Sequence, residues 1–199
     1  MSRATRAVCL AVLVLAVSCR TRAAEVVPQE GDLVLETSGS AQSGAIQWAT
    51  RSRWSHVGIV ERSGGEVRVI EALGRVSRTP WAAWVRRARR GGPYLVLRPR
   101  GLTTEQRRAA VAEARRFLGR PYDPRFGWGD DRIYCSELVV KAYERGAGIS
   151  FGRRERLGDL RLAGIEPAME RRWGGSIPRD RILVTPASLA DDRRLARVR

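Results

Sequence analysis

The sequence predicts one α+β domain behind an N-terminal export segment. A chain of 199 residues is long enough for one well-buried domain and too short for two ordinary domains with a linker. The β-branched, alternating stretch 55–73 predicts a hairpin, and the stretches 104–118 and 133–143 carry apolar residues at helical spacing. These observations together predict a fold of strands and helices over residues 25–199.

Residues 1–24 have the features of an export signal. Two arginines precede an apolar run over residues 7–17, and small residues follow it. The run is too short to span a bilayer comfortably. Two cleavage routes stay open: acylation of Cys19 at a lipobox-like sequence, which would anchor the protein to a membrane, or ordinary cleavage near residue 24. Both routes predict the bacterial periplasm or cell envelope.

The composition is strongly basic, with a formal net charge of +16. Such an excess favours anionic partners, among them a phospholipid surface or cell-wall polymers. Lys141 is the only lysine, so a general compositional bias towards arginine explains the charge equally well. Because the chain carries an export signal, we expect no nucleic-acid partner.

Periodicity together with turn and cap residues predicts the other elements. In chain order these are a strand at 33–35, a helix within 38–51, hairpin strands at 55–61 and 66–73, a loop or short helix at 80–90, a strand at 94–98, helices at 104–118 and 133–143, and a strand or brace at 182–184. Thr103 and Gln106 form a capping-box pattern before the first long helix. Asp130 or Asp131 is the expected cap of the second.

Cys135 is the one cysteine outside the export segment. An unpaired thiol in an oxidising compartment is either a buried small hydrophobe or a reactive group. Its predicted place in the first turn of a helix favours the thiolate, because the positive end of the helix dipole lowers the thiol pKa. Backbone N–H groups at the same helix end could stabilise an oxyanion.

His56, the only histidine, begins the first strand of the predicted hairpin. A four-residue loop at 62–65 would pair Glu61 with Glu66 and His56 with Glu71, which places His56 and Glu71 on one face. A carboxylate opposite an imidazole can orient the ring. A slip of one residue would move Glu71 to the other face.

Each of these three residues also has an ordinary structural explanation. His56 can be a packed strand residue, Cys135 a core residue, and Glu71 a solvated carboxylate. A cysteine at a helix start, with a histidine and a carboxylate on adjacent strands, is nevertheless the arrangement of papain-like enzymes.

Several segments carry a resemblance to a known family. They are GDLV at 31–34, SAQSGAIQ at 40–47, SHVGIV at 55–60, IEA at 70–72, DDRIYCSELV at 130–139 and ILVTPASL at 182–189. The chain resembles the YiiX/YaeF-like branch of the permuted NlpC/P60 papain-like superfamily, which is related to lecithin retinol acyltransferase-like proteins.

The resemblance implies a circularly permuted papain-like fold, in which histidine precedes cysteine as it does here. It implies Cys135 as nucleophile, His56 as general base and then acid, and Glu71 as the residue that orients the imidazole. It also implies a small antiparallel sheet packed against helices, with the cysteine helix against the central strands. The arginine-rich stretch 86–90 and the basic tail depart from the family pattern.

We therefore expect an exported cysteine hydrolase, either an amidase or peptidase or an acyltransferase, acting through an acyl-enzyme on amide or ester bonds of cell-wall peptides or acyl lipids. The alternative is a non-catalytic envelope module that binds a lipid or peptide. Tyr134 is expected to shape the pocket, and Trp54 and Trp128 either line it or belong to the core. We expect no cofactor, and no metal site, because one histidine and one cysteine supply too few ligands.

Overall fold

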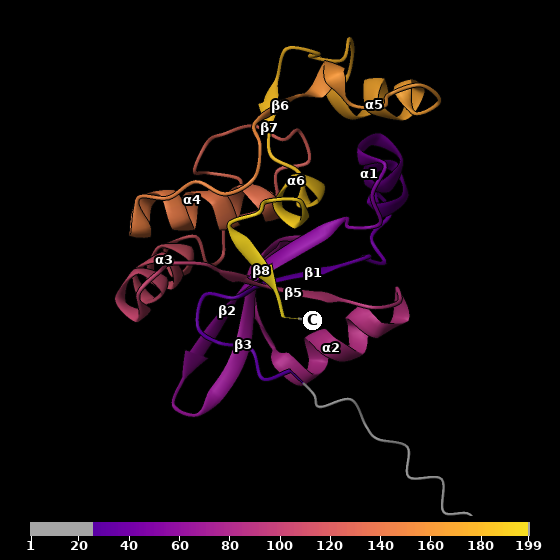
Figure 1. Ribbon diagram of the computed structural model, residues 1–199. Coiled ribbons are helices and arrows are strands. Elements are labelled where there is room, and N and C mark those ends of the chain that lie inside the picture. Colours follow the sequence, from indigo (N-terminus) through magenta and orange to yellow (C-terminus); the bar gives the residue numbers. More distant parts are fainter. Residues whose placement is uncertain (1–25, 199) are drawn as a thin grey trace, which may run out of the picture.

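The computed structural model describes residues 26–198 (Figure 1). A six-stranded sheet with the order β4-β3-β2-β1-β5-β8 forms its centre, and every neighbouring pair is antiparallel. A small two-stranded sheet, β6-β7, lies apart from it. The predicted α+β fold is confirmed. The predicted export segment, including Cys19, lies outside the described residues.

The strands are β1 (Leu33–Glu36), β2 (His56–Ser63), β3 (Glu66–Leu73), β4 (Arg75–Pro80), β5 (Leu95–Pro99), β6 (Glu155–Arg156), β7 (Ile182–Leu183) and β8 (Leu195–Arg197). The helices are α1 (Ser43–Thr50), α2 (Trp81–Arg90), α3 (Thr104–Arg116), α4 (Cys135–Ala147), α5 (Glu166–Trp173) and α6 (Pro186–Ala190), with a 3₁₀ turn, η1, at Leu157–Asp159. No helix within residues 26–198 is long and apolar enough to cross a bilayer.

Helices cover both faces of the large sheet, because alternate strand residues face opposite layers. Leu33, Val57 and Ile70 point into the core that α3 and α4 close. Val60 and Val69 point into a second core, closed by α2. Figure 1 shows α3 and α4 next to each other and α2 at the opposite side of the strands, with β6, β7 and α5 forming a separate upper part.

The β2–β3 hairpin has a tighter turn than predicted. Ser63 pairs with Glu66, so the loop holds only Gly64 and Gly65, with φ of 58° and 82°. Two positive φ angles are the requirement of a two-residue turn of type I′, which glycine meets without strain. The predicted four-residue loop, and the pairs built on it, are therefore wrong.

The corrected register places Glu71 opposite Gly58 rather than opposite His56. The shift is two residues, so it leaves every side chain on its predicted face. His56 and Glu71 consequently lie diagonally across the two strands, and Gly58 leaves the space between them free of a side chain.

The start of α4 also differs from the prediction. Tyr134 is the N-cap, and its backbone N–H donates to Glu137 Oε2 at 3.2 Å. Asp130 does not cap the helix, because its carboxylate pairs with Lys141 and Arg145 farther along α4. By contrast, the capping box of Thr103 and Gln106 is present at the start of α3.

Replacing Gly58 tests the close approach of β2 and β3. A Cβ at this position would clash with Val69 Cγ1 and lie 3.0 Å from the Ile70 carbonyl oxygen. We expect Gly58→Ala to lower the free energy of unfolding by about 1–3 kcal/mol. Gly44→Ala is the matched control, because Gly44 is helical and a Cβ there meets nothing within 4 Å. Urea unfolding measures both, and a Gly58→Ala chain as stable as wild type would contradict the register.

Candidate active site

The structure brings Cys135, His56 and Glu71 together, all three buried. Cys135 is the first residue of α4, His56 the first residue of β2, and Glu71 lies within β3. His56 Nε2 lies 2.7 Å from Glu71 Oε2. The His56 ring also interacts with the Cys135 thiol, by hydrogen bonding and by charge. Because Nε2 faces Glu71, Nδ1 is the ring nitrogen left for Cys135.

Buried hydroxyl groups hold the entry of β2, where His56 lies. Ser55 Oγ accepts the backbone N–H of Ser38 at 2.9 Å and lies 2.7 Å from Ser43 Oγ. The Ser55 backbone N–H donates to the Glu36 carbonyl oxygen. These bonds tie the residue before His56 to β1 and to the start of α1, so the imidazole is attached to a fixed backbone.

The environment favours a charged pair of thiolate and imidazolium. Burial of the ring lowers the pKa of His56, but hydrogen bonds and charges from Cys135 and Glu71 outweigh it and raise this pKa to about 10. Burial raises the pKa of the Cys135 thiol, but His56 and the backbone N–H of Val57 together bring it below its ordinary value. The N-terminal position on α4 acts in the same direction.

Glu71 has two further hydrogen-bond partners besides His56, namely Thr79 and Arg87. Thr79 Oγ1 donates to Glu71 Oε1 at 2.6 Å. Arg87 donates from Nη1 to Oε1 at 2.9 Å and from Nη2 to Oε2 at 2.6 Å. Burial raises the pKa of Glu71, but His56 and Arg87 outweigh burial and hold it at about 2. The carboxylate is therefore ionised and fixed on both oxygens.

Arg87 connects Glu71 to a second buried carboxylate. Its Nε donates to Glu36 Oε1 at 2.9 Å, and Glu36 is 1% exposed. Burial raises the pKa of Glu36, and its Oε2 has no hydrogen-bond partner among the described residues. Glu36, His56 and Glu71 each offer a ligand atom, and these atoms lie within 4.8 Å of one another.

Sequence reasoning missed Arg87, Thr79 and Glu36. Arg87 lies in the arginine-rich stretch 86–90, which predicts a solvent-exposed run. A signal for its role was present, because Arg87 lies next to Ala88 and three residues after Trp84, and both of these are buried on α2.

A cavity of about 90 Å³ opens beside Cys135. Its walls are mostly apolar and come from α1, residues 122–126, the start of α4 and residues 157–186. Tyr134 lines the cavity, as expected. Trp54 and Trp128 do not line it and instead pack against the main core.

Arg87→Met should remove the cation between two buried carboxylates. We expect the free energy of unfolding to fall by about 3 kcal/mol at pH 7, as for a broken buried ion pair. The loss should shrink towards pH 5, because the unpaired carboxylates then have raised pKa values in the folded state and take up a proton there before they do in the unfolded state.

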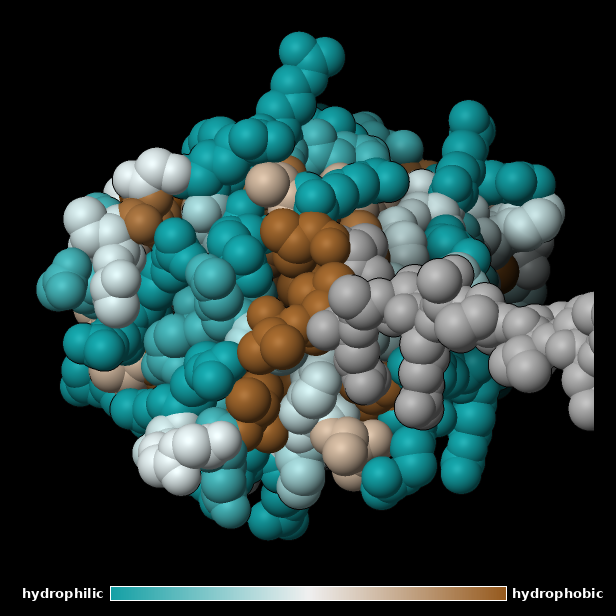
Figure 2. All heavy atoms as spheres, turned by 60° about the horizontal axis from the view of Figure 1, so that its bottom comes forward, coloured by the Kyte–Doolittle hydropathy of each residue, from teal (hydrophilic) through white to brown (hydrophobic). Residues whose placement is uncertain are grey.

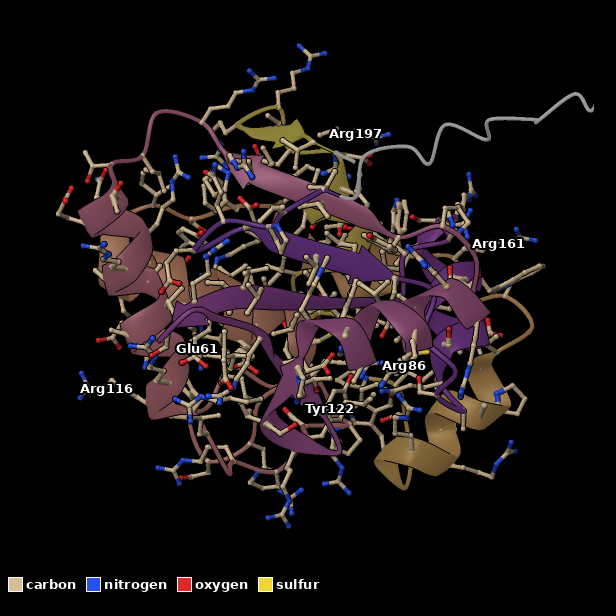
Figure 3. The ribbon with its side chains drawn as sticks, turned by 90° about the horizontal axis from the view of Figure 1, so that it is seen from below. Glu61, Arg86, Arg116, Tyr122, Arg161 and Arg197 are labelled. Carbon is tan, nitrogen blue, oxygen red and sulfur yellow. The ribbon has the colours of Figure 1, made fainter. Side chains whose placement is uncertain are left out.

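Arg86→Met is the control for Arg87→Met, because Arg86 is exposed on the same helix (Figure 3). We expect it to change stability by less than about 0.5 kcal/mol. Urea unfolding at both pH values makes the comparison. Equal losses in the two variants, or a loss for Arg87→Met that is the same at pH 7 and pH 5, would contradict the bridge.

Comparison with known proteins agrees with this geometry. The family described as permuted papain-like amidase enzymes, YaeF/YiiX, C92 family, matches residues 27–199. The uncharacterized protein YiiX of Escherichia coli strain K12 is 37% identical over 174 residues, which is 86% of each chain. A crystal structure described as metalloprotein YiiX from Escherichia coli O157:H7 has a TM-score of 0.82 at 37% identity, covering 86% of this chain and 97% of that one.

The family match covers nearly all of the residues that the structure describes. It includes the cysteine at the start of α4 and the histidine at the start of β2. The chain belongs to the permuted papain-like amidase family of YaeF and YiiX.

Proposed function

We propose that this chain is a cysteine amidase in which Cys135 is the nucleophile, His56 the proton carrier and Glu71 the residue that orients His56. The contact of one buried imidazole with both the thiol and the carboxylate carries this proposal. A packing cysteine has no need of such a partner, whereas a thiol nucleophile depends on it.

In the first half of the reaction, the Cys135 thiolate attacks the carbonyl carbon of an amide. Negative charge develops on the carbonyl oxygen. The backbone N–H groups in the first turn of α4 are candidate donors to it, because a helix leaves its first N–H groups without partners within the helix. His56 then gives its proton to the leaving nitrogen, the C–N bond breaks, and an acyl-enzyme forms.

In the second half, water attacks the acyl-enzyme. Neutral His56 takes a proton from the water, the C–S bond breaks, and the acid leaves as thiolate and imidazolium are restored. Glu71 stabilises the imidazolium in the resting state, because its carboxylate stays ionised. The same steps apply to an ester, and an acceptor other than water would give acyl transfer.

The substrates that we propose are amide or ester bonds of cell-wall peptides or acyl lipids. The apolar cavity beside Cys135 supports this choice, because such a lining favours an alkyl chain or an apolar side chain over a polar group.

A metal ion fits this site poorly, although the related YiiX structure is described as a metalloprotein. Glu36, His56 and Glu71 are close enough to share an ion. However, the Arg87 guanidinium already binds both carboxylates, and His56 Nε2 faces Glu71. A divalent cation would have to displace the half-buried guanidinium of Arg87 from two buried carboxylates, so the proposed mechanism uses none.

We also propose that the protein is exported to the bacterial periplasm or cell envelope, with Cys19 as a candidate lipid anchor and anionic headgroups as a candidate partner. Arg116, Arg161 and Arg197 lie at the periphery of the molecule (Figure 3). Figure 2 shows that hydrophilic residues cover most of the face at the bottom of Figure 1, crossed by one hydrophobic strip. The formal net charge of +16 supports attraction to anionic headgroups.

The pH dependence of Cys135 alkylation by iodoacetamide tests the thiolate–imidazolium pair. We expect an apparent thiol pKa below the ordinary value of about 8.5 in the wild-type chain. In His56→Ala it should rise above that value, because burial then acts without its largest counterweight. Glu71→Gln should give a smaller rise, since it acts on the thiol only through His56.

Circular dichroism shows whether each of these variants is folded. A folded His56→Ala chain with the wild-type alkylation profile would contradict the pair and favour a non-catalytic lipid- or peptide-binding module of the same fold.

Cys19→Ser tests the proposed anchor. If Cys19 is acylated, the wild-type chain should fractionate with membranes and the variant should become soluble, because the chain then lacks the acylated residue. Extraction in high salt distinguishes anchoring by an acyl chain from attraction through charge, because salt weakens only the latter. A wild-type chain that leaves the membrane in salt alone would contradict acylation.

A further inference from the structure

We propose that the cavity beside Cys135 selects amides in which an apolar acyl group is joined to an amino acid with a free carboxylate, and that Arg172 binds this carboxylate. The inference rests on the proposed amidase function and names the substrate class of the same site. It assigns the acyl side of the substrate to the apolar wall and the leaving group to Arg172.

Arg172 is unusual among the arginines near the site. Among the described residues that line the cavity, it is the only arginine, and no lysine, aspartate or glutamate lines it. Its Nη1 donates to Gln42 Oε1 at 3.0 Å, and its guanidinium lies 5.8 Å from the Phe126 ring centroid. No carboxylate within residues 26–198 lies within 4 Å of its nitrogens, whereas Arg87 binds two.

Arg172 is therefore a half-buried cation that a neutral amide and an aromatic ring hold in place. Its planar fork of donors matches a carboxylate. An anionic group bound there would supply the charge partner that the described residues do not. One guanidinium beside a neutral amide supplies a single positive charge, which suits a carboxylate better than a doubly charged phosphate.

The position of Arg172 relative to the nucleophile follows from the cavity that both residues line. Gln42 and Tyr122 line the same cavity, and Arg172 Nη1 donates to Gln42 Oε1 at 3.0 Å. The guanidinium and the thiol thus face one space of about 90 Å³. An anion bound to Arg172 would consequently lie in the same cavity as the reacting bond.

Most of the remaining wall is apolar. The apolar part is made by side chains from α1, η1 and its following loop, α5 and β7, namely Ile46, Leu157, Leu160, Leu162, Ile165, Met169 and Leu183. These side chains offer no hydrogen bonds to a peptide backbone, so an alkyl chain or an apolar side chain suits them best.

An N-acyl amino acid satisfies both halves of the cavity at once. Its carboxylate is two bonds from the amide nitrogen, so it falls on the leaving-group side when the carbonyl carbon meets Cys135 Sγ. The S–C bond forms, the C–N bond breaks, and the amino acid leaves with the His56 proton. Water then releases the acid, and no other reactant is needed.

Binding to the full chain with Cys135→Ala tests this proposal without turnover. The probes are N-octanoylglycine and N-octanoylglycinamide, which differ only in the carboxylate, and isothermal titration calorimetry gives the Kd of each. We expect N-octanoylglycine to bind at least tenfold more tightly. When Arg172→Gln is combined with Cys135→Ala, the ratio of the two Kd values should fall to about one. Arg172→Lys in the same background should keep part of the difference.

Arg171→Gln is the matched control, because Arg171 is exposed on the same helix and does not line the cavity. It removes the same charge and should keep the tenfold ratio. Equal Kd values for the two probes, or a ratio that survives Arg172→Gln, would overturn the proposal. Tighter, Arg172-dependent binding of N-octanoylphosphoethanolamine would also overturn it, because the site would then be one for phosphate.

These outcomes are independent of the proposed chemistry. The binding ratio is measured without the nucleophile, while the alkylation profile of Cys135 tests the catalytic pair without any acyl ligand. In a chain that keeps Cys135, Arg172→Gln should raise the KM for N-octanoylglycine at least tenfold more than the KM for N-octanoylglycinamide, with released glycine or glycinamide as the readout.

Discussion

The site depends on one buried carboxylate, Glu71, that is bonded by side chains from α2 and from β2. Glu71 accepts from Arg87, which comes from α2 on one face, and it faces His56, which reaches Cys135 on α4 at the other face. A buried carboxylate is costly unless charges and hydrogen bonds surround it. The chain surrounds Glu71 with an arginine, a threonine hydroxyl and an imidazole, so the same contacts that make its burial tolerable also fix the ring.

This arrangement explains why the site lies where strands end. Within a strand, side chains alternate between the two cores, so a residue in mid-strand faces only one of them. His56 is the first residue of β2 and can contact groups from both layers. Gly58, opposite Glu71, provides the space for the diagonal approach, because any side chain there would collide with β3.

Local sequence patterns predicted the two hairpin strands and both long helices, because each leaves a periodic signal. They also singled out Cys135, His56 and Glu71 as candidates, and the structure brings these residues together. The predicted loop length was wrong because Ser63, Gly64 and Gly65 are compatible with more than one turn type. The polar residues beside them do not distinguish between the two registers. Arg87 and β4 failed for a different reason. Both lie in stretches rich in polar side chains, which carry no apolar periodicity. The burial of Arg87 and the pairing of β4 are set by contacts with Glu71 and with β3, respectively.

The cap of α4 illustrates the same limit. Asp130 has the side chain of a good cap, but Lys141 and Arg145 compete for it through contacts that exist only once the helix has formed. The sequence therefore predicts the secondary structure more fully than the ion pairs. The partners of a buried or half-buried carboxylate come together only in the tertiary fold.

The site unites residues that meet at very different sequence separations. His56 and Glu71 are only 15 residues apart on one tight hairpin, and their contact can form as soon as that hairpin does. Cys135 joins them only when a helix from a distant part of the chain docks, which is a slower, long-range event. Until then its thiol lacks the imidazole beside it. The contact of the thiol with His56 thus exists only in a chain whose topology is complete.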